Sequence, residues 1–226
     1  MFDQDELHEE CGIFSIFNAD DAAAHTVLGL HALQHRGQEG AGIVTCEENA
    51  FHSHFCKGLV GENLSQENII STLKGRNAIG HVRYSTTGSK TTNYFQPLTA
   101  EYEFGKLAIA HNGNIPNASQ IKDDLISKGA IFKSDTDSEI FIHLLAQSNK
   151  KTLVERLIET VNKIQGAFSL TIMTQNEIIA IKDPHGIRPL ALGKLDDSYI
   201  FASESCAFDI INAKYIREIE PGEIVV

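Results

Sequence analysis

Short strand-like segments follow one another in the last third of the chain with only tight connections between them. Residues 168–172 alternate in polarity, residues 177–182 are mostly apolar, and residues 199–202 form another apolar segment. Residues 183–186, Asp-Pro-His-Gly, have the composition of a turn. Parallel strands need a crossover of a dozen or more residues, whereas antiparallel strands do not. The sequence therefore predicts sheets that are largely antiparallel.

Helical patterns lie between the groups of strand segments. Apolar residues recur at helical spacing from Asp20 to Gln34, and further helices are predicted over residues 117–128 and 152–164. Helices in pairs between groups of strands indicate sheets that are covered by helices. The predicted fold class is α+β.

Three local patterns predict where helices begin or end. Asp20 or Asp21 can cap the first helix, and Thr136 and Glu139 have the spacing of a capping box before another apolar run. Gly166 is predicted to stop the helix over residues 152–164.

Composition excludes several classes of protein. The 226-residue chain has a formal net charge of −11, whereas proteins that bind nucleic acid use clustered lysine and arginine against phosphates. No apolar run approaches the roughly 20 residues that span a bilayer. Four scattered cysteines do not make a disulfide scaffold, and the first ten residues are acidic, unlike a secretory signal. We expect a cytoplasmic protein with free thiols, a single domain, and neither nucleic acid nor membrane as a partner.

The strongest candidate for chemistry is Cys11, which stands between the acidic pair Glu9-Glu10 and an apolar strand over residues 13–17. Gly12 follows it directly and leaves little bulk near the sulfur. Cysteine is also among the residues most often buried for packing alone. Position by itself therefore favours a structural role until other motifs are considered.

Other segments hold polar groups at strand ends. Arg83 ends a strand, where its guanidinium can bind a carboxylate through two hydrogen bonds. Asn112-Gly113 is first of all a turn signal, but it can also present an amide and a backbone N–H to an oxyanion. The capping-box spacing accounts for Thr136 and Glu139 but gives no role to Asp137, which lies between them. His52, His54 and Cys56 share one face of a strand, but no second ligand pair follows, so a zinc site is not predicted.

Taken together, seven blocks of the sequence resemble the amidophosphoribosyltransferase family, which belongs to the class II glutamine amidotransferases and N-terminal-nucleophile hydrolases. The blocks occur in family order along the whole chain and are Glu10–Phe14, Leu33–Gly42, Gly80–Thr86, His111–Asn114, Ser134–Glu139, Asp183–Leu190 and Ser203–Phe208.

The resemblance implies a four-layer αββα sandwich of two largely antiparallel sheets. It also implies that residues 1–10 are a leader peptide, that residues 11–226 are the glutaminase domain, and that the C-terminal phosphoribosyltransferase domain of the family is absent from this chain. Removal of the leader would make Cys11 the first residue. A free α-amine has a pKa near 8 and can accept the thiol proton, which a peptide nitrogen cannot.

Site residues are carried over from the family onto matching positions. Cys11 is the expected nucleophile that forms a γ-glutamyl thioester, with Asn112 and Gly113 holding the oxyanion. Arg83 and Asp137 are expected to bind the α-carboxylate and α-ammonium of glutamine. Two further substrate-binding residues are Thr86, within a closing loop over residues 84–88, and Arg36, which is expected to order the site.

The family also implies partners and leaves alternatives open. Glutamine is the expected substrate, and the ammonia would serve to make 5-phosphoribosylamine from PRPP in the first step of de novo purine synthesis. No cofactor is expected in this domain; full-length members use Mg²⁺ with PRPP in the absent domain, some carry an iron-sulfur cluster, and a homo-oligomer is expected. The alternatives are the glutaminase domain of a glucosamine-6-phosphate synthase or glutamate synthase, or a non-catalytic regulatory domain that retains the fold.

Overall fold

Two antiparallel sheets form the centre of the protein in a computed structural model that describes residues 11–84 and 95–226. The larger sheet has seven strands, in the order β11 (Lys214–Glu218), β9 (Ala191–Leu195), β10 (Ser198–Ala202), β1 (Gly12–Phe17), β4 (Asn77–Arg83), β2 (Gly40–Glu47) and β3 (Ala50–Lys57). The smaller sheet has five, in the order β12 (Ile224–Val225), β8 (Ile178–Lys182), β7 (Ala167–Met173), β6 (Gly105–Asn114) and β5 (Leu98–Tyr102).

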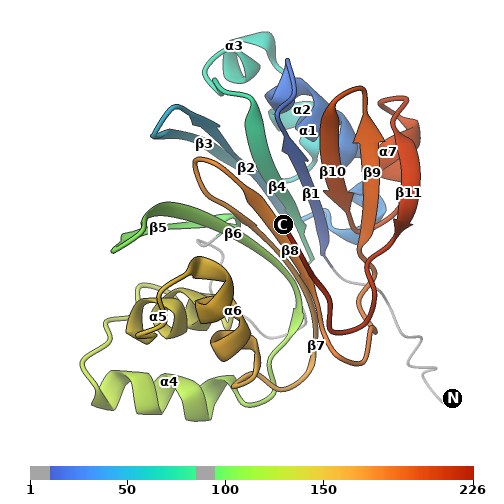
Figure 1. Ribbon diagram of the computed structural model, residues 1–226. Helices are drawn as coiled ribbons and strands as arrows, with labels where there is room; N and C mark the ends of the chain where they lie inside the picture. Colours follow the sequence, from blue (N-terminus) through green and yellow to red (C-terminus); the bar gives the residue numbers. More distant parts are fainter. Residues whose placement is uncertain (1–10, 85–94) are drawn as a thin grey trace, which may run out of the picture.

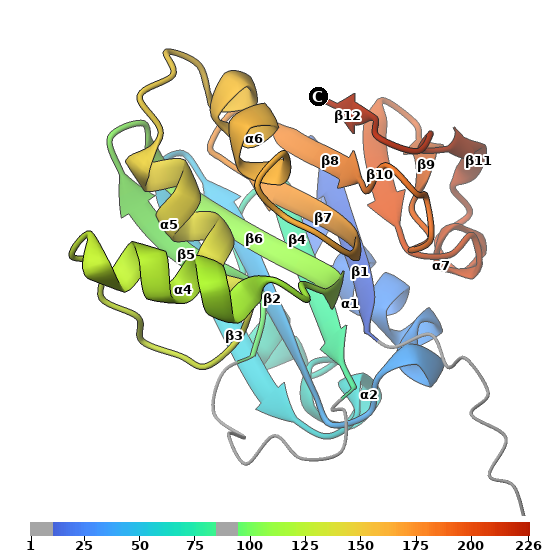
Figure 2. The same ribbon diagram turned by 90° about the horizontal axis from the view of Figure 1, so that it is seen from below.

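Helices cover the outer face of each sheet (Figures 1 and 2). The larger sheet is covered by α1 (Ala22–Ala32), α2 (Val60–Asn63), α3 (Glu67–Ile70) and α7 (Cys206–Asp209), with the short 3-10 helix η1 (Gln34–Arg36) after α1. The smaller sheet is covered by α4 (Ala118–Ser127), α5 (Glu139–Gln147) and α6 (Leu153–Val161). The predicted α+β class and antiparallel sheets are confirmed.

Three apolar clusters hold these four layers together. One cluster packs α1 and its neighbours on the larger sheet, a second packs α4, α5 and α6 on the smaller sheet, and a third lies between the sheets. Ile13 and Ile79 of the larger sheet meet Ala108 and Ala110 of β6 in this third cluster. Beside them the Ser15 hydroxyl donates to the Thr171 hydroxyl across the sheets at 2.8 Å. The small alanines of β6 allow the sheets to approach closely.

The predicted helices are present, but two of the predicted caps are wrong. Asp21 precedes α1 without a side-chain hydrogen bond to the helix. Helix α5 begins at Glu139, whose carboxylate accepts from the backbone N–H groups of Lys133 and Ser134 and so does not form a capping box with Thr136. Helix α6 ends at Val161, before the predicted stop at Gly166.

The turn expected at Asn112-Gly113 is also absent. Strand β6 continues through both residues to Asn114 and stays paired with β7, so Asn112 lies opposite Ser169 and Gly113 opposite Phe168. A Cβ atom at Gly113 would lie 2.2 Å from the carbonyl oxygen of Ala167, and the φ of +145° is one that other residues rarely adopt. Tertiary pairing therefore overrides the local turn signal.

The glycines near Cys11 are required by close packing rather than by unusual backbone angles. A Cβ at Gly12 would meet Val82 and Leu33, at 2.9 and 3.1 Å. At Gly37 it would lie 2.5 Å from the backbone carbonyl carbon of Arg83. Because Gly12 and Gly37 have no side chain, η1 and the end of β4 can pack closely against the start of β1.

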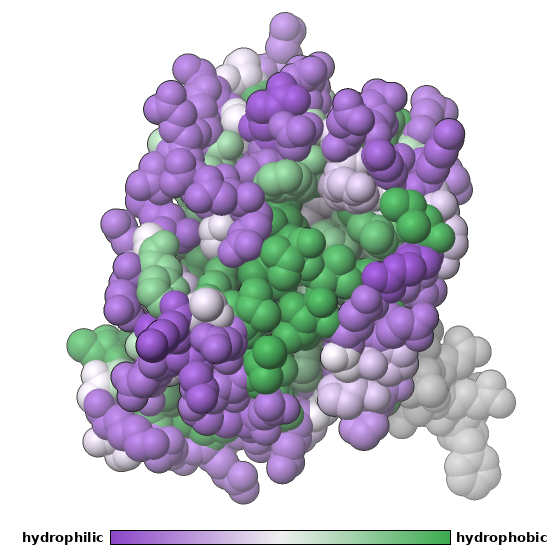
Figure 3. All heavy atoms as spheres, viewed as in Figure 1, coloured by the Kyte–Doolittle hydropathy of each residue, from purple (hydrophilic) through white to green (hydrophobic). Residues whose placement is uncertain are grey.

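An apolar strip crosses the face of the molecule shown in Figure 3, where the edges of the two sheets meet near the last residue. It follows a groove whose apolar lining residues are Phe17, Ile178, Leu192, Tyr199, Phe201, Val225 and Val226. Within the part of the chain that the structure describes, no helix is long and apolar enough to cross a membrane.

Candidate active site

Cys11 lies at the entrance to β1, the strand that pairs with both β10 and β4 in the larger sheet. It is half-buried, and its Sγ is 3.8 Å from the carbonyl oxygen of Tyr84, just past the end of β4. Its φ of +66° is in the left-handed region, which costs a non-glycine residue about 1–2 kcal/mol. Backbone strain of this kind is concentrated at functional sites.

Arg36 binds both backbone groups of Cys11. The N–H of Cys11 donates to the carbonyl oxygen of Arg36 at 2.9 Å, and Nε of Arg36 donates to the carbonyl oxygen of Cys11 at 2.6 Å. The Arg36 side chain is only 2% exposed and also pairs with Glu204. Arg36 therefore contacts the predicted nucleophile through both backbone polar groups of Cys11.

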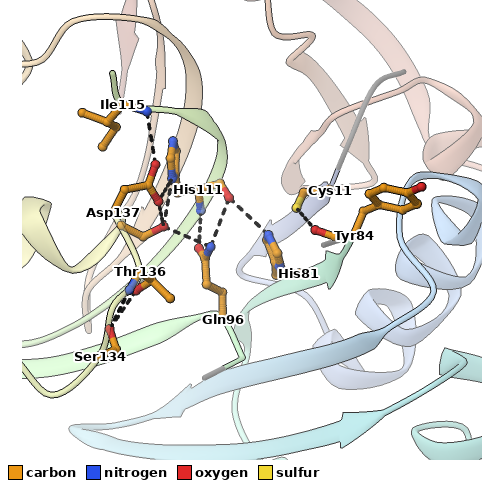
Figure 4. A network of polar contacts seen from close by, with 10 residues as sticks. Cys11, His81, Tyr84, Gln96, His111, Ile115, Ser134, Thr136 and Asp137 are labelled. Carbon is orange, nitrogen blue, oxygen red and sulfur yellow. Dashed lines mark hydrogen bonds and ion pairs between the residues drawn. The ribbon is translucent and has the colours of Figure 1, made fainter. Parts of the chain in front are cut away.

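His81 connects the end of β4 to the end of β6. It lies opposite Ile13 in the β1–β4 pair, and its Nε2 donates to the carbonyl oxygen of His111 at 3.1 Å (Figure 4). Burial lowers the pKa of His81 to about 3, so the ring is neutral and can donate to a carbonyl. Cys11 is two residues from Ile13, and Asn112 is next to His111. Cys11 and Asn112 therefore lie at the same end of the two-sheet sandwich.

Asn112 carries a buried amide that no other described residue satisfies. Its side chain lies on the same face of β6 as Ala108 and Ala110, which pack between the sheets. The residue is fully buried, and within residues 11–84 and 95–226 neither Oδ1 nor Nδ2 has a hydrogen-bond partner. A buried polar group without a partner costs about 1–3 kcal/mol. An amide retained at that expense is suited to bind a ligand.

Past its pairing with β5, strand β6 directs backbone N–H groups toward side chains of neighbouring segments. His111 N–H donates to the side-chain oxygen of Gln96 at 2.7 Å, and Ile115 N–H donates to a carboxylate oxygen of Asp137 at 3.1 Å. Alternate residues of a strand direct their N–H groups to the same edge. The N–H of Gly113 therefore faces the space between Gln96 and Asp137, where an anionic oxygen can receive it.

Asp137 lies in the segment that leads into α5, beside the end of β6. Its Oδ1 is 3.8 Å from Nδ1 of His111, which is in turn 2.9 Å from the Ser138 hydroxyl. Burial lowers the pKa of His111, against the opposing effect of Asp137, so the ring is neutral. The half-buried Asp137 carboxylate thus lies beside the end of β6, close to Asn112 and Gly113.

Glu139 holds the Asp137 segment in place, and this support should depend on pH. Burial would raise its pKa, but hydrogen bonds from Ser134 and Lys133 outweigh burial and hold the pKa below the ordinary 4.5. A carboxyl group whose pKa is lower in the folded state than in the unfolded state stabilises the fold at pH values above its unfolded-state pKa. This stabilisation is lost as the pH falls through the folded-state pKa.

We expect Glu139→Gln to lower the free energy of unfolding by about 2 kcal/mol near neutral pH, because the bonds to a charged acceptor are lost. The difference between wild type and variant should shrink as pH falls below 4.5. Urea unfolding at a series of pH values measures it. A difference that stays constant with pH would contradict this assignment.

The remaining predicted residues are placed as follows. Arg83 is the last residue of β4, half-buried and opposite Gly40, at the same end as Cys11. Thr86 and all but the first residue of the predicted closing loop lie outside the described residues. Among residues 11–84 and 95–226, no three histidine, cysteine, aspartate or glutamate side chains are grouped to hold a metal ion.

Residues 81–209 match the sequence model of the family described as glutamine amidotransferase domain. The chain belongs to this family. It is 48% identical to an amidophosphoribosyltransferase of Rhizobium etli, over 99% of this chain and 45% of that protein. It is 45% identical to chloroplastic amidophosphoribosyltransferase 3 of Arabidopsis thaliana, over 99% of this chain and 42% of that protein.

A solved structure gives the same result. Glutamine phosphoribosylpyrophosphate amidotransferase from Bacillus subtilis, complexed with ADP and GMP, matches with a TM-score of 0.87 and 44% identity, over 95% of this chain and 46% of that one. This chain is a class II glutamine amidotransferase domain closely related to the N-terminal region of amidophosphoribosyltransferases. It spans less than half the length of these relatives.

Sequence reasoning missed the residues that hold this site together. These residues are His81, Gln96 and Glu204, and each contacts a residue that is distant in the sequence. Gln96 accepts from the backbone N–H of His111, and Glu204 pairs with the side chain of Arg36. His81 and Glu204 fall within the blocks that carry the family resemblance, but nothing in their local pattern indicates a role. Only the fold shows which groups they contact.

Proposed function

We propose that this amidotransferase domain hydrolyses the side-chain amide of glutamine through a covalent thioester on Cys11 and releases ammonia. By extension from its relatives' names, the ammonia would convert PRPP to 5-phosphoribosylamine in the first step of de novo purine synthesis. The observation that carries the proposal is the buried Asn112 amide, without a partner among the described residues, at the same end of the sandwich as Cys11.

The nucleophile acts with its own backbone nitrogen as base. After removal of residues 1–10, the α-amine of Cys11 takes the thiol proton and the thiolate attacks the γ-carbonyl carbon of glutamine. The Arg36 carbonyl that receives the Cys11 N–H at 2.9 Å supports this step, because it would orient the amine beside its own sulfur. The amine then returns the proton to the departing ammonia.

Two donors stabilise the oxyanion that forms in the attack. Nδ2 of Asn112 and the N–H of Gly113 are the groups that this proposal assigns, since a preformed pair of donors requires no reorganisation during the reaction. Water then attacks the γ-glutamyl thioester through a second oxyanion of the same kind, and glutamate leaves with Cys11 restored as a thiol.

The charged α-carbon groups of glutamine determine recognition in this proposal. Asp137 binds the α-ammonium, and Arg83 binds the α-carboxylate with two parallel hydrogen bonds. Thr86 is assigned to the loop that closes over the substrate. The bond from Ile115 N–H to Asp137 at 3.1 Å supports the assignment, because it holds the carboxylate next to the end of β6.

We expect Asp137→Asn to raise the KM for glutamine about tenfold to a hundredfold, because a charge-assisted bond of about 1.5–3 kcal/mol is lost. Asp135→Asn is the matched control, since Asp135 is 76% exposed and pairs only with Lys122 among the contacts described. Arg83→Lys should also raise KM, because an ammonium does not reproduce the planar fork of arginine. Steady-state glutaminase kinetics measure all three; an unchanged KM in both site variants would show that glutamine is recognised elsewhere.

The wider roles stay proposals for the full-length protein. Binding of PRPP with Mg²⁺ is assigned to the phosphoribosyltransferase domain of the family, together with homo-oligomer formation and any iron-sulfur cluster. A glucosamine-6-phosphate synthase or glutamate synthase type, and a non-catalytic domain, have less support, since the relatives at 42–48% identity carry the amidophosphoribosyltransferase name. A cytoplasmic location is proposed too, although the Arabidopsis relative is named as chloroplastic.

A further inference from the structure

Arg36 is an almost completely buried cation that pairs with a carboxylate. Its Nη1 donates to Oε1 of Glu204 at 2.5 Å, and Glu204 is 34% exposed. A buried charge is strongly destabilising unless a counter-charge holds it. The Glu204 carboxylate therefore helps to hold the Arg36 guanidinium, and with it the Cys11 carbonyl that the guanidinium binds.

Glu204 is itself fixed to the strand that carries the nucleophile. Ser203 donates its N–H to the carbonyl oxygen of Ile13 at 3.0 Å, and its hydroxyl accepts from the Ile13 N–H at 2.9 Å. These bonds extend the β1–β10 pairing by one residue toward Cys11. Glu204 follows directly, so its carboxylate is anchored beside the start of β1.

The charge of Glu204 is maintained by its neighbours. Burial alone would raise the pKa of its carboxyl, but the hydrogen bond and charge of Arg36, and then those of His35, hold the pKa below its ordinary value. His35 contacts the second oxygen, Oε2, at 3.0 Å from a position that is 56% exposed. The carboxylate thus stays ionised at neutral pH, with Arg36 as its buried partner.

We infer that Glu204 is a positioning residue for the nucleophile, which holds Arg36 and, through Arg36, the backbone of Cys11 in the geometry that thioester formation requires. Glu204 does not itself contact glutamine in this inference. The inference deepens the proposed function and rests on it for its kinetic consequence. A group that orients the reactive residue affects the rate of the chemical step more than substrate binding.

The test compares Glu204→Gln with Glu103→Gln in the leader-free protein. Glu103 is a matched control because it also pairs with a nearly buried arginine, Arg156, at 2.6 Å, on the far side of the smaller sheet. Glu204→Gln should lower kcat about tenfold to a hundredfold while KM stays within about threefold. Glu103→Gln should leave both constants unchanged, with a similar fall in Tm. Glu204→Asp retains the charge and should recover part of the lost kcat.

A second readout needs no glutamine. The rate of Cys11 alkylation by iodoacetamide, followed by peptide mapping, should fall in Glu204→Gln and not in Glu103→Gln. If the wild type fails to hydrolyse glutamine, the proposed function is wrong while the alkylation rates still test the role of Glu204. Wild-type kcat and alkylation rate in Glu204→Gln, or an equal loss of kcat in Glu103→Gln, would overturn the inference.

Discussion

A chain that begins at Cys11 is expected to hydrolyse glutamine about a hundredfold to ten-thousandfold faster than one that retains residues 1–10. While Glu10 is attached, the nitrogen of Cys11 is an amide and has no basic lone pair to take the thiol proton. In the structure this N–H donates to the Arg36 carbonyl, and the sulfur beside it is half-buried. We also expect the attached leader to hinder the approach of glutamine to the sulfur.

Three preparations, each verified by intact mass, separate these effects. They are the leader-bearing chain with a Glu10 substitution that blocks cleavage, the chain that begins at Cys11, and the same short chain with its α-amine acetylated. Acetylation removes the base without restoring the leader, so a slow acetylated chain assigns the effect to the amine. Equal rates in the leader-bearing and leader-free chains would remove the N-terminal-nucleophile mechanism.

Replacing Cys11 with alanine should abolish glutamine hydrolysis, with a loss of at least about a thousandfold, because no thioester can form. The other three cysteines are poorer nucleophiles. Burial raises the pKa of the thiols of Cys46, Cys56 and Cys206, so less thiolate is present at neutral pH. Their alanine variants should keep glutaminase activity.

Labelling by an electrophilic glutamine analogue separates loss of chemistry from loss of folding. The wild type and the three control variants should each take up one label at Cys11, whereas Cys11→Ala should take up none and keep its Tm. Covalent labelling at Cys56 in place of Cys11 would show that Cys11 is not the nucleophile.

The fold class could be predicted because its determinants are local in the sequence. Strand segments with short connections and amphipathic helices between them were sufficient for antiparallel sheets covered by helices, and α4 falls within a residue of its predicted bounds. The strand order could not be predicted. β1 lies between β10 and β4, and the pair with β10 joins residues more than 180 positions apart.

Local signals failed where tertiary contacts compete with them. Thr136-Glu139 and Thr152-Glu155 have the same capping-box spacing, but only the second forms the box. Glu139 is buried and its carboxylate serves the backbone of residues 133–134, which sequence spacing cannot reveal. Asn112-Gly113 was a turn signal and became part of a central strand.

The contacts that support the candidate site could not be predicted from the sequence. Family resemblance named Cys11, Asn112 and Asp137, and the structure brings them to one end of the sandwich through contacts of His81 with β6. The Arg36–Glu204 pair joins residues 168 positions apart, so no local pattern contains it.

The most direct measurement is the intact mass of the leader-free protein, quenched with acid during turnover of glutamine and mapped by peptide. We expect a γ-glutamyl adduct on the N-terminal peptide at Cys11, which is lost in Cys11→Ala together with ammonia release. Ammonia release by the Cys11→Ala protein at the wild-type rate, or an adduct on any other cysteine, would contradict it.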